Sequence, residues 1–294
     1  MSSSDSLVVY KLDSMYETTI VKRPSAFCKT PYVADIEING TPYMAHTPAL
    51  GCCGLSDKDS RVIVSKISHK SNKSSKQTCE YRVELACIYE RGRYLRIGIN
   101  PKLAEVLIWN TLQNHMLRFV GHSSKVDREV TYLNSRFDFS GVDEHGRSFV
   151  LEVKNVPLAD YVDVAKSERS KYKGIERRKC YHEKIAYFPD GYRKNSTDVV
   201  SPRALKHIEE LTTLRTTTNH RTILCFVIQR TDIVHFQPSN IDLTYKRAVQ
   251  EAWNQGVEIY AIQYEWTDSG ECIFLRDDVP VMLYDQYGPQ NQSR

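Results

Sequence analysis

Residues 135–155, SRFDFSGVDEHGRSFVLEVKN, hold two acids and a lysine inside stretches that otherwise have the composition of β-strands. Side chains alternate between faces along a strand, so Glu152 and Lys154 should point to the same face. A hairpin that turns near His145 pairs residues whose numbers sum to about 290, which sets Asp138 opposite Glu152 with Cβ atoms about 5 Å apart. A slip of one residue would move Asp138 to the other face, so this prediction depends on the turn.

Two carboxylates this close repel each other unless one is protonated or a cation lies between them. An aspartate followed on the next strand by Glu-x-Lys suits metal-assisted hydrolysis of a phosphodiester. Asp138 and Glu152 would hold Mg²⁺ or Mn²⁺, and Lys154 would orient the water or contact the phosphate. The spacing alone is a weak pattern, because a solvent-facing ion pair on an edge hairpin would give the same residues.

Other chemistries lack the residues that they need. The eight cysteines form no CxxC pair and no Cys/His group with zinc spacing, so we expect free thiols, many of them buried. The GCCG stretch lacks the Gly-Lys-Ser/Thr ending of a phosphate loop. Neither a dinucleotide fingerprint nor a Ser-His-Asp elbow is present in the sequence.

The composition is that of a globular protein, with 41% hydrophobic and 26% charged residues and a net charge of +4. No apolar run approaches the roughly 20 residues that span a bilayer. The first residues have neither the basic nor the apolar region of a secretory signal. We therefore expect no membrane partner and an intracellular, reducing compartment, the cytoplasm or the nucleus.

The two halves of the chain differ in their patterns. After a loose tail, residues 15–95 hold five short β-type runs, which favours a small barrel. Residues 96–285 follow the order α-β-β-β-α-β-α-β, which predicts a mixed sheet with helices on both faces. The fold class expected is therefore α/β (α+β) with two domains.

Two basic segments could contact phosphates. The first, residues 66–76, includes Lys70 and Lys73, and the second has eight Lys or Arg against three Glu between residues 166 and 184. Four tyrosines lie near the second segment and could either stack on bases or pack against the protein; they are Tyr172, Tyr181, Tyr187 and Tyr192. Basic loops are also common as merely solvated surface.

In chain order, several stretches resemble the sugar fermentation stimulation protein A (SfsA) family: AHTPALGCCGL, INPKLAEVL, DREVTY, NSRFDF, FVLEVKNVPL, DVVSPRALKHIEEL, TILCFVIQR and AVQEAWNQGVEIYAI. The resemblance runs over most of the chain. It implies an OB-like N-terminal barrel and a restriction-endonuclease-like PD-(D/E)xK domain. It also implies DNA binding, with nuclease activity suspected from the fold.

The resemblance assigns roles to further residues. Asp138, Glu152 and Lys154 fill the catalytic and metal positions, and Glu129 fills the acid on the adjoining strand. Four residues fill polar positions that we assign to nucleic-acid contact together with Lys70 and Lys73; they are His46, Arg136, Lys206 and His207.

Three departures from the family pattern limit this transfer. Ala49 replaces an asparagine of the barrel motif, and Asn110 replaces a glutamate late in the first helix. Glu105 is no obvious substitute, because five residues turn a helix by about 500°, or about 140° around its circumference. A basic insertion at about 159–197 leaves open whether Asp190 or Asp198 matches a family aspartate.

The sequence thus favours a nucleic-acid-binding protein with a divalent-metal-dependent phosphodiesterase site, acting on DNA more than on RNA. A catalytically silent DNA-binding regulator with the same fold is the alternative, and an interaction protein that uses the insertion is a third. The clustered acids favour the first, because a pure binder has no need of acids that repel phosphate. The absence of the helix glutamate favours the second. A homodimer is compatible with either.

Overall fold

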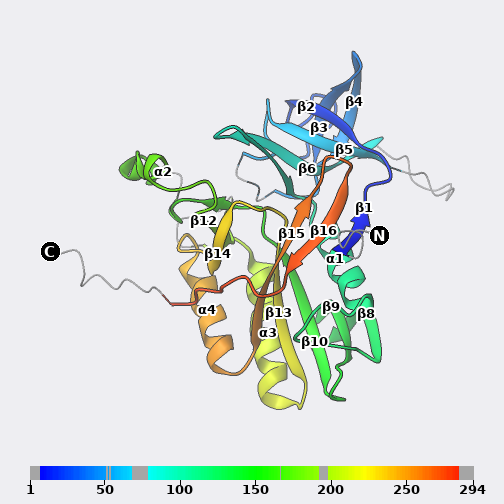
Figure 1. Ribbon diagram of the computed structural model, residues 1–294, viewed down its shortest axis with the longest axis vertical. Helices are drawn as coiled ribbons and strands as arrows, with labels where there is room; N and C mark the ends of the chain where they lie inside the picture. The colour runs from blue at the N-terminus through cyan, green and yellow to red at the C-terminus, as the bar shows by residue number, and fades with distance from the viewer. Residues whose placement is uncertain are drawn as a thin grey trace.

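The computed structural model describes residues 7–50, 52, 54–67, 79–165, 167–191 and 198–284. A barrel forms one end of the molecule, and a mixed sheet flanked by helices forms the other (Figure 1). Both predicted parts of the fold are therefore present. Among the described residues, no helix combines the length and the apolar character needed to cross a membrane.

The barrel is built from six strands in the order β4-β3-β2-β5-β6-β7. They are β2 (Tyr16–Lys22), β3 (Val33–Ile38), β4 (Thr41–His46), β5 (Arg61–Lys66), β6 (Tyr81–Glu90) and β7 (Arg93–Gly98). β4 also pairs in parallel with β6, which closes β4, β3, β2, β5 and β6 into a ring. The five predicted runs correspond to the strands of this ring, and β7 is an additional strand that the sequence pattern did not reveal.

A second sheet has the strand order β1-β16-β15-β13-β10-β9-β8. Its strands are β1 (Val8–Lys11), β8 (Lys125–Tyr132), β9 (Ser135–Val142), β10 (Ser148–Asn155), β13 (Arg221–Ile228), β15 (Glu258–Trp266) and β16 (Glu271–Arg276). β8, β9 and β10 form an antiparallel meander, and β10, β13 and β15 run parallel. The predicted strands of this part of the chain occur in the predicted order, and β1 and β16 are two further strands of the sheet that the pattern did not predict.

Helices cover both faces of this sheet. Helix α1 (Pro101–Gln113) packs on one face, and α3 (Pro202–Thr217) and α4 (Leu243–Asn254) pack on the other (Figure 1). Asn100 and Ser201 cap α1 and α3 by accepting hydrogen bonds from the backbone N–H groups of Lys102 and Ala204. The Asn-Pro and Ser-Pro pairs in the sequence therefore mark the helix starts as predicted.

The predicted loose tail is wrong for Val8–Lys11, which forms β1 antiparallel to β16. The chain thus passes through the large sheet at β1 before it enters the barrel. The backbone carbonyl of Val9 accepts a hydrogen bond of 2.7 Å from Asn110 Nδ2, which ties β1 to α1. A strand of four residues is too short for its alternation of apolar and polar residues to differ clearly from that of the neighbouring sequence, which explains why the sequence pattern missed it.

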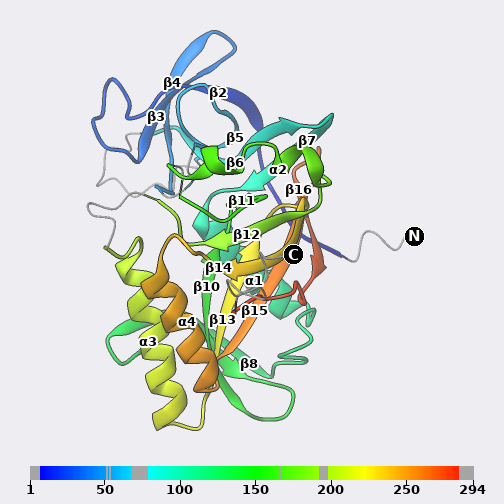
Figure 2. The same cartoon turned by 90° about the vertical axis from the view of Figure 1, so that its left-hand side faces the viewer.

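The predicted insertion contributes to a third sheet, ordered β11-β12-β14. It comprises β11 (Ala159–Asp160), β12 (Lys184–Phe188) and β14 (Ile233–Pro238), with a 3₁₀ helix at Arg169–Tyr172 and α2 (Ile175–Arg178) between the first two strands. This sheet lies between the barrel and helices α3 and α4 (Figure 2). Lys184 forms ion pairs with Glu90 of the barrel strand β6 and with the buried Asp232.

The tyrosines of this region mostly pack against the protein. Tyr181 and Tyr187 are buried, and Arg93 of the barrel lies over the ring of Tyr181 at 5.1 Å. Tyr172 is 39% exposed, and Tyr192 lies outside the described residues. The packing interpretation therefore holds for Tyr181 and Tyr187.

The cysteines are free thiols, as expected, wherever they are described. Five are buried, Cys180 is exposed and Cys28 is partly buried. Cys53 falls outside the described residues.

Candidate active site

The hairpin of β9 and β10 has the register that the sequence predicts. Its pairs run from Ser148 and Val142 to Leu151 and Phe139, so that Asp138 comes opposite Glu152 where the ladder ends. At this point the N–H of Val153 donates a hydrogen bond of 2.7 Å to Asp138 Oδ2. The side chain of Asp138 thus takes the place of a backbone partner on β9.

Glu152 lies in the interior of the sheet. β10 pairs with β13 on its other side, where Glu152 stands beside Leu224, so the hairpin is not an edge hairpin. The residue is 3% exposed. These two observations exclude the alternative of a solvent-facing ion pair, and a buried carboxylate requires charged or hydrogen-bonding partners.

Two side chains hold one oxygen of Glu152. Lys154 Nζ and His207 Nδ1 both contact Oε1. The carboxylate oxygen Oε1 can only accept, so His207 Nδ1 donates to it, and Arg203 Nε lies 3.4 Å from His207 Nε2. The other oxygen, Glu152 Oε2, is buried and has no hydrogen-bond partner within the described structure.

The two carboxylates have pKa values shifted in opposite directions. Burial and the charge of Glu152 raise the pKa of Asp138 to about 7, although the Val153 N–H opposes this shift. Burial alone would raise the pKa of Glu152, but Lys154 and His207 outweigh it and hold that pKa below its usual value. Glu152 is therefore ionised at neutral pH, whereas Asp138 is about half protonated there, which partly relieves the repulsion between the two carboxylates.

Glu105 of α1 is a neighbour of the acids that the sequence did not reveal. Its charge adds to the raised pKa of Asp138, and Lys102 pairs with it at 2.8 Å. Asn110 instead donates its hydrogen bond to β1. Glu105 is thus near enough to affect the pKa of Asp138, one member of the acid pair Asp138 and Glu152, and only the packing of the helix on the sheet could have shown this.

Glu129 is set apart from the acid pair by its contacts. Its carboxylate lies 3.4 Å from Arg136 and 4.0 Å from Lys102, and the side chain is half exposed. The residue has a positive φ of 53°, and it makes no ladder pair with β9, although the register is the same on both sides of it, at Arg128 and at Val130. The structure therefore associates Glu129 with cations at the rim of the site.

The predicted nucleic-acid contacts fall in different places. Arg136 and Lys206 are exposed near the acid pair, and Lys206 Nζ donates to the carbonyl of Asn134 at 2.7 Å. His207 is buried against Glu152. His46 belongs to the barrel, where it is the ladder partner of Arg82 between β4 and β6. Burial, and after it the positive charge of Arg82, lower the pKa of His46. Lys70 and Lys73 lie outside the described residues.

The donor set fits a hard divalent cation. Within the described ranges no group of three His, Cys, Asp or Glu side chains is already placed to hold a metal ion. Mg²⁺, however, usually takes only one or two carboxylates and completes its shell with water and substrate phosphate. Asp138 and the partnerless Oε2 of Glu152 match this requirement, since a buried carboxylate oxygen without a partner is costly.

Known proteins resemble this chain along most of its length. The family model "Sugar fermentation stimulation protein RE domain" matches residues 102–166 and 162–270. A sugar fermentation stimulation protein homolog from Clostridium acetobutylicum is 26% identical over 275 residues, which cover 93% of this chain and all of that one. A homolog from Citrifermentans bemidjiense is 28% identical over 273 residues, covering 92% and 97%.

A solved structure shares the fold. The structure of Pyrococcus furiosus SfsA in complex with Ca²⁺ superimposes with a TM-score of 0.69 at 17% identity. The superposition covers 94% of this chain and 99% of the other. The two-domain architecture is therefore shared along nearly the whole length.

Proposed function

Because this chain belongs to the SfsA family, we propose that it is a nucleic-acid-binding protein with a divalent-metal-dependent phosphodiesterase site of the PD-(D/E)xK type, acting on DNA in preference to RNA. One observation carries the proposal. Glu152 is buried and ionised, and Lys154 and His207 hold its Oε1. Its Oε2 has no hydrogen-bond partner within the described structure, and the carboxyl group of Asp138 is close enough to feel its charge.

Asp138 and Glu152 would hold Mg²⁺ or Mn²⁺. When bound, such an ion lowers the pKa of a water molecule and offsets the charge that develops on the phosphate. The Pyrococcus furiosus relative is described in complex with Ca²⁺, another hard divalent cation, which supports a cation site in this fold. Glu129 could act as an auxiliary acid only by giving up its pairs with Arg136 and Lys102.

The remaining residues would bind and orient the substrate. Lys154 would leave Glu152 to contact the scissile phosphate or the attacking water, while His207 keeps the Glu152 carboxylate in place. Arg136 and Lys206 are exposed cations suited to flanking phosphates. The barrel offers a second surface for a strand, because OB-type barrels bind single-stranded nucleic acids.

A second function is favoured by Asn110. The side chain at this position is neutral and engaged with the backbone of β1, so it supplies no charge to the site. A catalytically silent DNA-binding regulator would keep the fold under these conditions. It would bind nucleic acid in a salt-dependent manner and leave it intact.

Cleavage of labelled single- and double-stranded DNA and RNA in Mg²⁺, Mn²⁺ or EDTA tests the proposal. We expect cleavage of DNA that EDTA abolishes and that Glu152→Gln lowers at least about a hundredfold, in the range seen when one charge-stabilising group is removed. Glu209→Gln, on the exposed face of the same helix as His207, is the matched control. Salt-dependent binding without cleavage in either metal would favour the regulator instead.

A further inference from the structure

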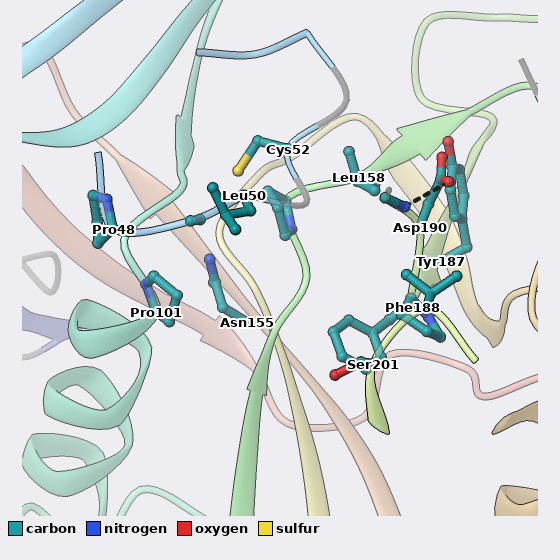
Figure 3. A pocket seen from close by; sticks show the side chains of 15 residues that line it. Pro48, Leu50, Cys52, Pro101, Asn155, Leu158, Tyr187, Phe188, Asp190 and Ser201 are labelled. Carbon is teal, nitrogen blue, oxygen red and sulfur yellow. Dashed lines mark hydrogen bonds between the residues drawn. The ribbon is translucent and has the colours of Figure 1, made fainter. Parts of the chain in front are cut away.

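A cleft lies where the barrel meets the larger domain. It has a volume of about 400 Å³ and is walled by the barrel segment around Pro48 and Leu50, the start of α1, the end of β10, and the segment from Tyr187 to Gly191 (Figure 3). Ser201, the cap of α3, completes the wall. Two stretches on which the resemblance to the SfsA family rests, AHTPALGCCGL and DVVSPRALKHIEEL, therefore meet at the cleft, together with Asp190, one of the two candidates for the family aspartate.

The chemistry of the cleft is opposite to that of a phosphate site. No Lys, Arg or His occurs among the described residues that line it, whereas Asp190 does. Its walls are largely proline and apolar side chains, including Pro48, Pro101 and Phe188. The described lining therefore offers no cation to a phosphate, whereas it offers apolar surface to a flat, uncharged ring. Ligand pockets of about 300–1,000 Å³ with few polar groups suit such a ring.

Asn155 supplies a fixed polar group in this wall. Its Nδ2 donates to the carbonyl of Gly98 at 3.0 Å, and its Oδ1 accepts from Gln229 Nε2 at 2.8 Å. Trp266 Nε1 in turn donates to Gln229 Oε1 at 2.9 Å. An amide nitrogen has two N–H groups, so one remains to meet the acceptor edge of a ligand in a fixed orientation.

The cleft and the acid pair are connected by one strand. Asn155 follows Glu152 by three residues on β10, which at the rise of a strand is about 10 Å. Nucleotides in a duplex are spaced about 3.4 Å apart along one strand, and an unpaired strand can be more extended, so this distance is within the reach of a few nucleotides. A strand with its phosphate at the acid pair would therefore bring a nearby base to the mouth of the cleft.

We propose that the interdomain cleft is a pocket for one unpaired nucleobase of the strand whose phosphate lies at Asp138 and Glu152. The inference rests on the proposed function and adds to it a preference for single-stranded or locally unpaired substrate. The barrel contributes to base binding through the segment at Pro48–Leu50, while the larger domain holds the phosphate.

Photocrosslinking of wild-type protein tests this placement without any substitution. Single-stranded oligonucleotides carrying one 4-thiothymidine are irradiated on the full chain in EDTA, and the crosslinked peptides are mapped by mass spectrometry. Crosslinks at residues 48–50 or 187–191 support the pocket. Crosslinks confined to other surfaces would overturn it.

A second experiment fills the pocket with a larger side chain. Leu50 lines the cleft and is 50% exposed, so Leu50→Trp should block its mouth and leave the core intact. Leu275→Trp, at a residue 40% exposed on β16, is the control. We expect Leu50→Trp to weaken binding of the oligonucleotide about 5- to 150-fold, the range for losing one stacked base. Equal affinity of the two variants would contradict the pocket.

Two further comparisons separate this inference from the proposed function. An abasic residue at the crosslinked position should weaken binding to wild-type protein and have no effect on Leu50→Trp. Glu152→Gln should keep the crosslinks while losing cleavage. Crosslinks at the pocket together with undiminished cleavage by Glu152→Gln would support the pocket and refute the catalytic site. Loss of cleavage in Glu152→Gln without crosslinks at the pocket would support the catalytic site and refute the pocket.

Discussion

His207 and Glu152 are joined by a hydrogen bond between Nδ1 and Oε1, although 55 residues separate them in the chain. Lys154 contacts the same oxygen, so both partners of this carboxylate lie on one side of it. Oε2 is consequently buried with no partner in the described structure. One oxygen is held in place while the other is left for a cation, and this asymmetry underlies our account of the site.

Replacing His207 should weaken cation binding without unfolding the protein. His207→Ala removes the group that orients Glu152, and loss of such a supporting contact typically costs about 10–100-fold in metal affinity. His207→Asn, whose amide can donate in place of Nδ1, should recover most of it. Mn²⁺ titrations of both variants, with the exposed His145→Asn as control, check this. Equal affinities in all three would show that His207 has no positioning role.

Asp138 should make stability depend on pH in the metal-free protein. An unfolded aspartate titrates near pH 3.9, whereas the pKa of Asp138 is raised to about 7 in the folded protein. Between these values the folded state binds more protons than the unfolded state, so this contribution to stability is lost as the pH rises. Asp138→Asn removes this pH-dependent contribution to stability, because the amide does not titrate.

Urea unfolding in EDTA at several pH values between about 5 and 8 measures this effect. The stability of the wild type relative to Asp138→Asn should fall across that interval. A difference that stays constant with pH would mean that the folded pKa of Asp138 is close to its unfolded value.

Lys184 should couple the barrel to the rest of the protein. Its side chain is 6% exposed and pairs with Glu90 of β6 and with Asp232, which is completely buried. Lys184→Ala leaves Asp232 paired with Arg230 alone and Glu90 without this cation, so we expect a loss near the lower end of the range of about 3–5 kcal/mol that breaking a buried ion pair costs. Lys171→Ala, at an exposed pair, should cost less than about 1 kcal/mol. Denaturant unfolding of the two variants distinguishes them, and similar losses would show that the buried network adds little.

The sequence predicted what depends on local pattern. The register of the acid hairpin followed from its turn and from the alternation of β9 and β10, and the structure has that register. The strands of the barrel ring and the capped starts of α1 and α3 likewise rest on periodicity and on residues next to each other in the chain.

The parts that escaped prediction depend on how elements pack. The contact of His207 with Glu152 needs α3 to lie across β10, and the approach of Glu105 to Asp138 needs the orientation of α1. The cleft requires the barrel loop to meet the segment after β12. Single-sequence periodicity identifies which face of a helix is apolar, but it does not say which strand that face will cover.

The central claim is that Asp138 and Oε2 of Glu152 together hold a divalent cation. Mn²⁺ binding followed by electron paramagnetic resonance tests it directly, since free and bound Mn²⁺ give different signals. We predict a site in wild-type protein and in Glu209→Gln that is lost in Glu152→Gln and in Asp138→Asn. Binding to Glu152→Gln with the stoichiometry and affinity of the wild type would contradict the claim.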